Sequence, residues 1–155
     1  RSGLRPLRPE WLTGRTVLSL DVSREGSRVA VVSADAAGRR RLDVAGIGRA
    51  PGGRPQRVEV PRPAGRSLAE ISDVSWADRT NLVVVAAEAS GDRRVYQVEV
   101  GGLTTELPAL SGPVEVHAGD GLRDVYVLTA RGRVLVRSGN GWRYLGRGIS
   151  ITVPE

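Results

Sequence analysis

The 155-residue chain is 40% hydrophobic and carries a formal net charge of +6. It contains no cysteine, which excludes disulfides, thiolate metal sites and cysteine nucleophiles. It has no uninterrupted apolar run of about 18 residues, so the sequence offers no candidate transmembrane helix. No signal peptide is visible, and because the chain begins at Arg1 we expect it to be a piece of a longer protein.

The composition favours short strands over helices. Phe and Met are absent, and Val, Leu, Ala and Ile supply most of the apolar content beside 20 Gly and 9 Pro. β-branched residues between frequent turn residues are typical of an all-β protein. All 23 basic residues are Arg, a bias that fits a high-G+C genome and weakens a functional interpretation of any single arginine.

The first predicted hairpin lies in "DVSREGSRVAVVSAD", Asp21–Asp35. A charged turn containing Gly26 leads into the apolar run Val29–Val32, which is the order expected of a β-hairpin. A second copy in Ile71–Ala89 places Asp73 where Asp21 stands, at an offset of 52 residues. A third, looser copy follows at a further offset of 42 residues, in Val114–Ala130.

Each copy is followed by a further pair of strand-like runs. In chain order these runs are Arg40–Ile47 with Gln56–Val60, Arg93–Val100 with Thr104–Pro108, and Gly132–Ser138 with Gly141–Gly146. We interpret Gly46–Pro55 as a surface loop inserted in the first unit. Asn140-Gly141 predicts a two-residue hairpin turn.

Four short strands repeated every 42 to 52 residues are typical of β-propeller blades. We therefore predict an all-β propeller segment of about three four-stranded antiparallel blades, at approximately 16–63, 68–110 and 112–148. Because propellers use about four to eight blades, residues 1–155 are expected to form the C-terminal portion of a larger propeller domain. Its open faces would pack against the rest of the same propeller or drive self-association.

The inventory of side chains argues against catalysis. His117 is the only histidine, which excludes a multi-histidine metal site, and we expect it at a strand end or facing the channel. Gly65–Ala69 departs from the G-x-S-x-G nucleophile elbow. Asp120 and Asp124 are too few for the oxygen ligands of calcium. The sequence predicts no enzyme, cofactor or metal. A pair of carboxylates for glycoside hydrolysis is the alternative that the sequence does not exclude, because propellers bring distant loops together.

A weak glycine motif occurs in "GIGRAPG", Gly46–Gly52, which begins like a dinucleotide-binding loop. Pro51 stands at its last required glycine and no helix follows, so we expect no nucleotide site there.

Two arginine clusters occupy similar places in the first two units, and they consist of Arg39, Arg40, Arg41, Arg93 and Arg94. A rim of guanidinium groups suits an acidic protein or an anionic envelope polymer. Interspersed acids and few aromatics argue against nucleic acid. The alternative is that these charges are solvated and keep strand edges from pairing.

Aromatic and acidic residues near the strands also have structural interpretations. We expect Trp76 to pack between blades, and Trp142 and Tyr144, which alternate in the last strand, to pack on one blade face. Asp21 and Asp73, at equivalent repeat positions, are interpreted as strand-end residues that bond to turn backbone.

The motifs "VSREGSRVAVV", "SWADRTNLVVV", "TTELPAL" and "GRVLVRSGNGWRYLGRG" resemble, in this order, the C-terminal propeller of the actinobacterial lipoprotein LpqB family. The likeness covers Val17–Gly148. It implies an extracytoplasmic lipoprotein, attached to the cell membrane by a lipid anchor that is not in this chain. It also implies an accessory role to a two-component system of the MtrA–MtrB type.

The resemblance and the arginine clusters lead to two alternative functional predictions. The first is a non-catalytic interaction module that modulates a sensor kinase in envelope homeostasis and cell division, with the extracellular sensor domain of the histidine kinase as its partner. The second is the binding of an anionic cell-envelope polymer through the Arg-rich rim. Neither involves nucleic acid.

Overall fold

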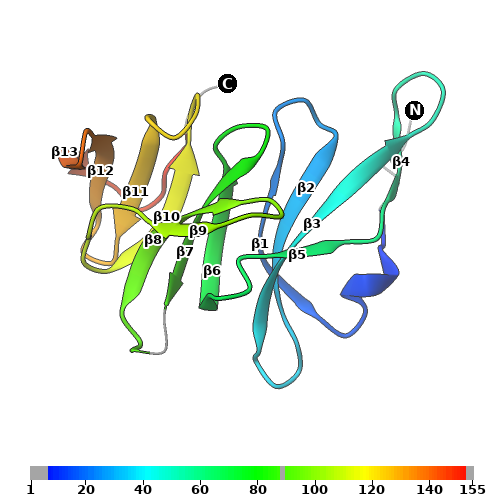
Figure 1. Ribbon diagram of the computed structural model, residues 1–155, viewed down its shortest axis with the longest axis horizontal. Helices are drawn as coiled ribbons and strands as arrows, with labels where there is room; N and C mark the ends of the chain where they lie inside the picture. The colour runs from blue at the N-terminus through cyan, green and yellow to red at the C-terminus, as the bar shows by residue number, and fades with distance from the viewer. Residues whose placement is uncertain (1–6, 88–89, 153–155) are drawn as a thin grey trace.

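The computed structural model describes residues 7–87 and 90–152, and its strands form three antiparallel sheets (Figure 1). The predicted all-β class with several antiparallel four-stranded units is confirmed. Only one helical turn, the 3-10 segment η1 (Glu10–Leu12), occurs within the described ranges. In those same ranges no helix is long and apolar enough to cross a membrane.

The first sheet is a meander whose outer edge is divided between two short strands. It contains β1 (Thr16–Val22), β2 (Arg28–Ala34), β3 (Arg40–Arg49), β4 (Pro55–Val58) and β5 (Arg62–Ala64). β5 pairs with the beginning of β3, and β4 pairs with its end.

The predicted loop at Gly46–Pro55 is therefore mostly wrong. β3 continues to Arg49 and β4 begins at Pro55, which leaves only residues 50–54 as a turn. The apolar pattern ends near Ile47, but pairing with β4 gives the backbone of Gly48 and Arg49 its hydrogen-bonding partners.

The second and third sheets are simple four-stranded meanders. The second contains β6 (Ala69–Trp76), β7 (Asn81–Ala87), β8 (Arg93–Glu99) and β9 (Thr104–Glu106). The third contains β10 (Pro113–Ala118), β11 (Val125–Thr129), β12 (Arg133–Ser138) and β13 (Gly141–Arg147).

The tight turn between β12 and β13 is shifted by one residue from its predicted place. Gly141 pairs with Ser138, so the turn residues are Gly139 and Asn140 rather than Asn140 and Gly141. Gly139 has a φ of 56°, a left-handed conformation that glycine adopts at little cost.

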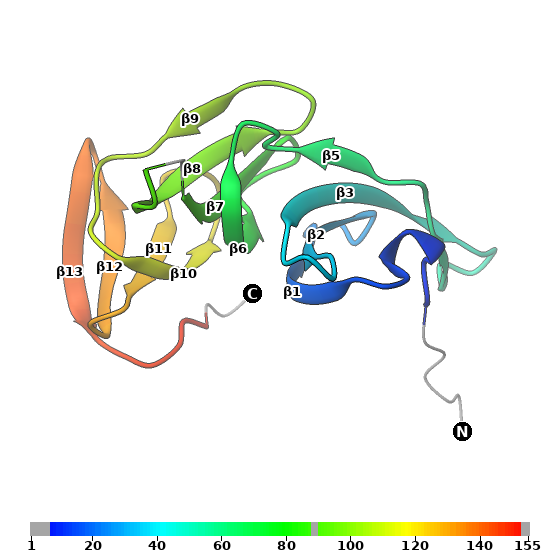
Figure 2. The same ribbon diagram turned by 90° about the horizontal axis from the view of Figure 1, so that it is seen from below.

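The three sheets spread like a fan (Figure 2). The first strand of each sheet, β1, β6 or β10, lies at the inner edge, whereas β5, β9 and β13 lie along the outer edge. We call β1, β6 and β10 the inner strands. Because the inner strands lie near one another, residues far apart in the sequence meet along this edge.

Most of the apolar core lies between the sheets, and a smaller cluster around Val29 and Val31 lies on the first sheet beneath Trp11. On β7, Leu82 and Val84 pack against the first sheet, and Val83 and Val85 pack against the third. All four are fully buried, which explains why this strand is a continuous apolar run rather than an alternating one. Each sheet is therefore stabilised mainly by its neighbour, which makes the three sheets one packed body.

Candidate functional site

The inner strands of the first two sheets are joined through Asp21. Its carboxylate accepts hydrogen bonds from the Ser75 hydroxyl at 3.1 Å and from the Trp76 backbone N–H at 2.7 Å. The Trp76 indole N–H donates to the Asp21 carbonyl at 3.2 Å. The Trp76 backbone N–H, on the side of β6 that faces away from β7, thus has its acceptor in the neighbouring sheet.

Asp73 on β6 joins three inner strands. It accepts hydrogen bonds from the Ser19 hydroxyl of β1 at 2.6 Å and from the Val116 backbone N–H of β10 at 2.8 Å. Two residues further on, the Ser75 hydroxyl accepts a bond from the Ala118 N–H at 3.1 Å. Burial raises the pKa of Asp73, and the bond from Ser19 offsets part of that rise.

The expected role of Asp21 and Asp73 in binding turn backbone is wrong, because both carboxylates bind the next inner strand. Their assigned equivalence is wrong as well. The last pairs before the two turns are Val22 with Val29 and Trp76 with Leu82, so Asp21 corresponds to Ser75. Both segments contain the letters Asp-Val-Ser, and matching these letters gives an offset of 52 residues between the two copies. The strand pairing gives an offset of 54 residues, the separation of Asp21 and Ser75.

One turn of the first sheet reaches directly to the third. Arg24 donates from its guanidinium to the Asp120 carboxylate and to the Gly119 carbonyl, both at 2.9 Å. Both side chains are largely exposed, so this ion pair contributes little stability. Its value is geometric, since it shows that the β1–β2 and β10–β11 turns lie at the same end of the molecule.

His117 and the acids near it do not assemble into a metal site. His117 is half-buried on β10, where it pairs with Tyr126 across the ladder. Asp120 is engaged by Arg24. Over residues 7–87 and 90–152, no group of three or more metal-ligating side chains is close enough to hold an ion.

The first predicted arginine cluster stands at the beginning of β3 and is largely ion-paired. Arg39 contacts Asp35 at 2.9 Å, and Arg41 contacts the buried carboxylate of Asp43 at 2.5 Å. Arg41 also donates to the carbonyl of Trp11. The charges of these two arginines are therefore balanced by carboxylates of the same sheet.

Arg40 reaches across to the second sheet. It lies 3.5 Å from the Glu70 carboxylate and donates to the Ile71 carbonyl. Glu70 has a φ of 46° at an irregularity in the β6–β7 pairing, an unusual conformation for a residue with a side chain. The contact ties the first sheet to this irregular segment.

The second cluster begins β8 at the same end of the molecule. Arg94 lies within 3.5 Å of both Asp92 and Glu106. Arg93 is exposed. β3 and β8 begin at the same end of the fan (Figure 1), so the five arginines border one end of the molecule, although most of their charge is balanced locally.

The aromatic residues divide between packing and exposure. Trp76 is buried in the core between the first two sheets, which confirms its predicted place. Trp142 packs against the core between the second and third sheets and donates to the Pro108 carbonyl at 2.7 Å. Tyr144 is 50% exposed, with the Arg133 guanidinium 5.4 Å from its ring centre, so the packing expected for it is wrong.

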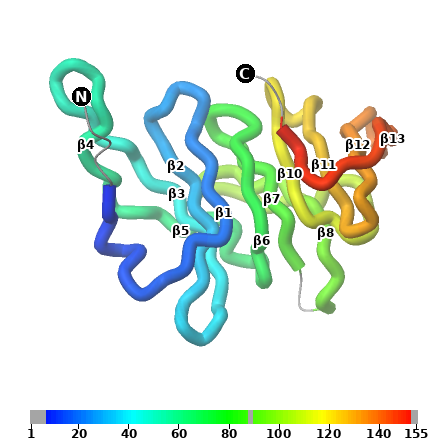
Figure 3. The backbone as a smooth tube through the Cα atoms, turned by 180° about the vertical axis from the view of Figure 1, so that it is seen from behind, coloured from blue at the N-terminus to red at the C-terminus, as the bar shows by residue number. Residues whose placement is uncertain are grey.

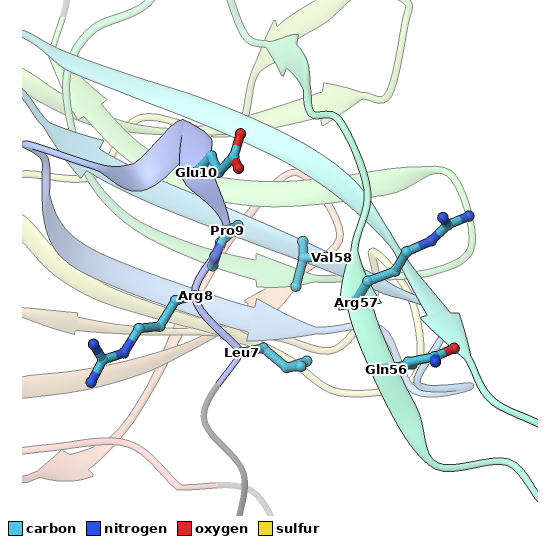
Figure 4. A pocket seen from close by; sticks show the side chains of 7 residues that line it. All are labelled: Leu7, Arg8, Pro9, Glu10, Gln56, Arg57 and Val58. Atoms are coloured by element: carbon cyan, nitrogen blue, oxygen red, sulfur yellow. The ribbon is translucent and has the colours of Figure 1, made fainter.

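A cleft of about 490 Å³ separates the N-terminal segment from β4 (Figure 4). Leu7 and Val58 point into this gap, whereas the side chains of Arg8 and Arg57 point away from it. A site for an anion needs donors that converge on one point. The two cations do not converge, so the cleft carries no ligand assignment.

One face of the first sheet is covered at Val29 and Val31 by Trp11 and Leu12, but it is open at its β1 edge. Leu20 and Val22 on β1 are 57% and 44% exposed. In each of the other two sheets, the preceding sheet covers the residues at the corresponding positions of the inner strand, and these residues are at most 6% exposed. They are Val74, Trp76, Val116 and Ala118. The face of β1 thus has the character of an interface without a partner sheet.

Comparison with known proteins adds a family to this geometry. The family model of the lipoprotein LpqB β-propeller domain matches residues 4–154. A search of curated proteins and a search of solved structures each gave no match. Three consecutive meander sheets with their first strands at a shared inner edge are the arrangement that a propeller requires. The chain belongs to the LpqB lipoprotein β-propeller domain family.

Proposed function

We propose that this chain is a non-catalytic interaction module of a cell-surface lipoprotein. The observation that carries the proposal is the continuous packing of the three sheets, which holds their hairpin turns in fixed positions at the two ends of the body. Turns on a rigid scaffold are suited to docking a macromolecule.

The proposed partner is the extracellular sensor domain of a histidine kinase of the MtrA–MtrB type. Family membership supports an extracytoplasmic lipoprotein, held at the membrane by a lipid anchor outside this chain. Through this contact, the propeller would modulate kinase signalling in envelope homeostasis and cell division.

The chain is also proposed to be part of a larger propeller. The open face of β1 supports this, because the corresponding faces of the other two sheets are covered. A further sheet packed on Leu20 and Val22 would remove this apolar surface from water.

Binding of an anionic envelope polymer through the Arg-rich rim is the alternative. Four of the five rim arginines already lie near carboxylates, which leaves Arg93 without such a neighbour among the described residues. Paired arginines present less net charge to a polymer. This observation favours the protein partner.

Calorimetric titration of the chain with the kinase sensor domain, at low and at high salt, tests the proposal. We expect saturable one-to-one binding that persists at high salt, because contacts in a packed protein interface are only partly screened. A parallel titration uses teichoic acid as the polyanion. Weak polyanion binding that disappears steeply with salt, together with no binding of the sensor domain, would favour the polymer alternative.

A further inference from the structure

The segment after β13 does not continue along the outer edge of the third sheet. From Gly148 onward its described part, up to residue 152, turns back across this sheet and reaches β10 (Figure 3). The Gly148 N–H still bonds to the Gly132 carbonyl, but Ser150 and Ile151 have reached Glu115 on β10. The segment therefore travels from the outer edge of the molecule to its inner edge.

The contact at Glu115 repeats the one that joins the first two sheets. The Ser150 hydroxyl and the Ile151 backbone N–H both donate to one oxygen of Glu115, each at 3.1 Å. In the same way, a serine hydroxyl and the backbone N–H of the residue after it, in β6, both donate to one oxygen of Asp21. A carboxylate on one inner strand thus holds a Ser-X pair of the next segment in both places.

The sequence of the segment also matches an inner strand. Ile149-Ser150-Ile151-Thr152 has the same alternation as Leu18-Ser19-Leu20-Asp21 in β1. Ile149 is 99% exposed, which is unusual for isoleucine and shows that its apolar side chain is not covered by the described residues.

We infer that residues 149–152 form the inner strand of a fourth sheet, and that their free edge binds the second strand of that sheet. The inference rests on the proposal that the chain is part of a larger propeller. Successive N–H groups of an extended strand point to opposite edges. Residues 149 and 150 form a bend in this structure. Since the Ile151 N–H points to Glu115, extension of the segment directs the N–H groups of Ser150 and Thr152 toward the edge where a second strand would pair.

The occupant of that edge is a segment of the same propeller that supplies the second, third and outer strands. A second copy of this chain does not fit, because each of its three sheets already contains its own inner strand, β1, β6 or β10. The second strands of this chain, β2, β7 and β11, are rich in valine and largely buried. The docking strand is therefore expected to be a short apolar strand of the same kind.

The first test uses the isolated chain and amide hydrogen exchange measured by NMR. Glu115→Ala should accelerate exchange of the Ile151 amide about tenfold by removing its acceptor. Glu99→Ala, which changes an exposed carboxylate on β8, is the matched control and should leave that amide unchanged. Equal exchange of Ile151 in both variants would contradict the clamp at Glu115.

The second test compares the isolated chain with the complete lipoprotein. The amides of Ser150 and Thr152 should be protected about a hundredfold or more in the complete protein, because a second strand then accepts their hydrogen bonds. The side chains of Leu20 and Val22 report independently, through solvent accessibility of cysteines placed there, on whether a larger propeller forms. If the side chains at positions 20 and 22 are protected but the amides of residues 150 and 152 are not, the inferred fourth-sheet strand is overturned and the larger propeller stands. If neither the side chains nor the amides are protected, both the fourth-sheet strand and the larger propeller are overturned.

Discussion

Asp73 illustrates how one side chain can join three sheets. Its two oxygens accept bonds from β1 and from β10, while its own backbone belongs to β6. Asp73 is half-buried, and its removal leaves two part-buried donors without their acceptor, which costs more than the gain of an ordinary hydrogen bond.

Asp73→Ala is therefore expected to lower the free energy of unfolding by about 2 to 4 kcal/mol. Urea denaturation followed by circular dichroism measures this change. Asp92→Ala is the control, because the Asp92 side chain is 74% exposed and its neighbour Arg94 also has Glu106. A similar small loss in both variants would mean that Asp73 does not hold the inner strands together.

Asp73 should also give stability an unusual dependence on pH. Burial raises its pKa in the folded protein, so the folded state takes up this proton at a higher pH than the unfolded state does. The free energy of unfolding of the wild type, relative to Asp73→Asn, should therefore rise as pH falls from 7 toward 4. Other carboxylates oppose this trend in both proteins, including Asp35, whose pKa is lowered by the bond from the Arg39 N–H. Urea denaturation of both proteins at four pH values gives the difference in their free energies of unfolding. A decrease in this difference as pH falls would contradict the raised pKa of Asp73.

The sequence indicated that these acids matter but not what they bind. Asp21 and Asp73 stand beside turn residues, so local bonding was the natural expectation. Their true partners lie 43 to 55 residues away in either direction along the chain, and no local pattern encodes such a contact. The same limit applies to the arginines, whose clustering was visible but whose ion pairs depend on how the strands pack.

Strands were easier to predict than their ends. Runs such as Leu82–Val85 are apolar and rich in β-branched valine, and each became the centre of a strand. The extension of β3 to Arg49 was missed because glycine and arginine there have low strand propensity, and pairing with β4 overrides it. The turn at Gly139 was displaced for a similar reason, since the register of the two strands decides which residues turn.

The burial of equivalent positions in different sheets leads to a prediction at the scale of the strand. Val74→Ala should lower the free energy of unfolding by about 1 to 3 kcal/mol, because Val74 is 4% exposed in the core between the first two sheets. Leu20→Ala, at the corresponding position of β1, should change it by less than about 0.5 kcal/mol. Thermal or urea unfolding of both variants provides the comparison. A large loss for Leu20→Ala would show that its face is covered in solution.

At the scale of the whole molecule, the rim arginines are expected to steer a partner rather than to hold it. Arg39 and Arg93 are exposed at the same end of the fan. The double variant Arg39→Glu/Arg93→Glu should slow association with an acidic sensor domain and leave its dissociation rate nearly unchanged. Surface plasmon resonance separates the two rates. Arg79→Glu, in the turn between β6 and β7 at the other end, is the charge-matched control; an equal effect there would argue against a specific rim.

The central claim is that the three sheets act as one rigid body that holds its turns in place for a partner. Both large cores lie between sheets, and among the described residues only the first sheet has a small apolar cluster of its own, around Val29 and Val31. The second and third sheets therefore have no separate core with which to remain folded alone. Differential scanning calorimetry of the isolated chain tests this most directly. The account predicts one cooperative transition, with a calorimetric enthalpy equal to the van't Hoff enthalpy. Separate transitions for individual sheets would contradict it, since loosely joined sheets do not fix the positions of their turns.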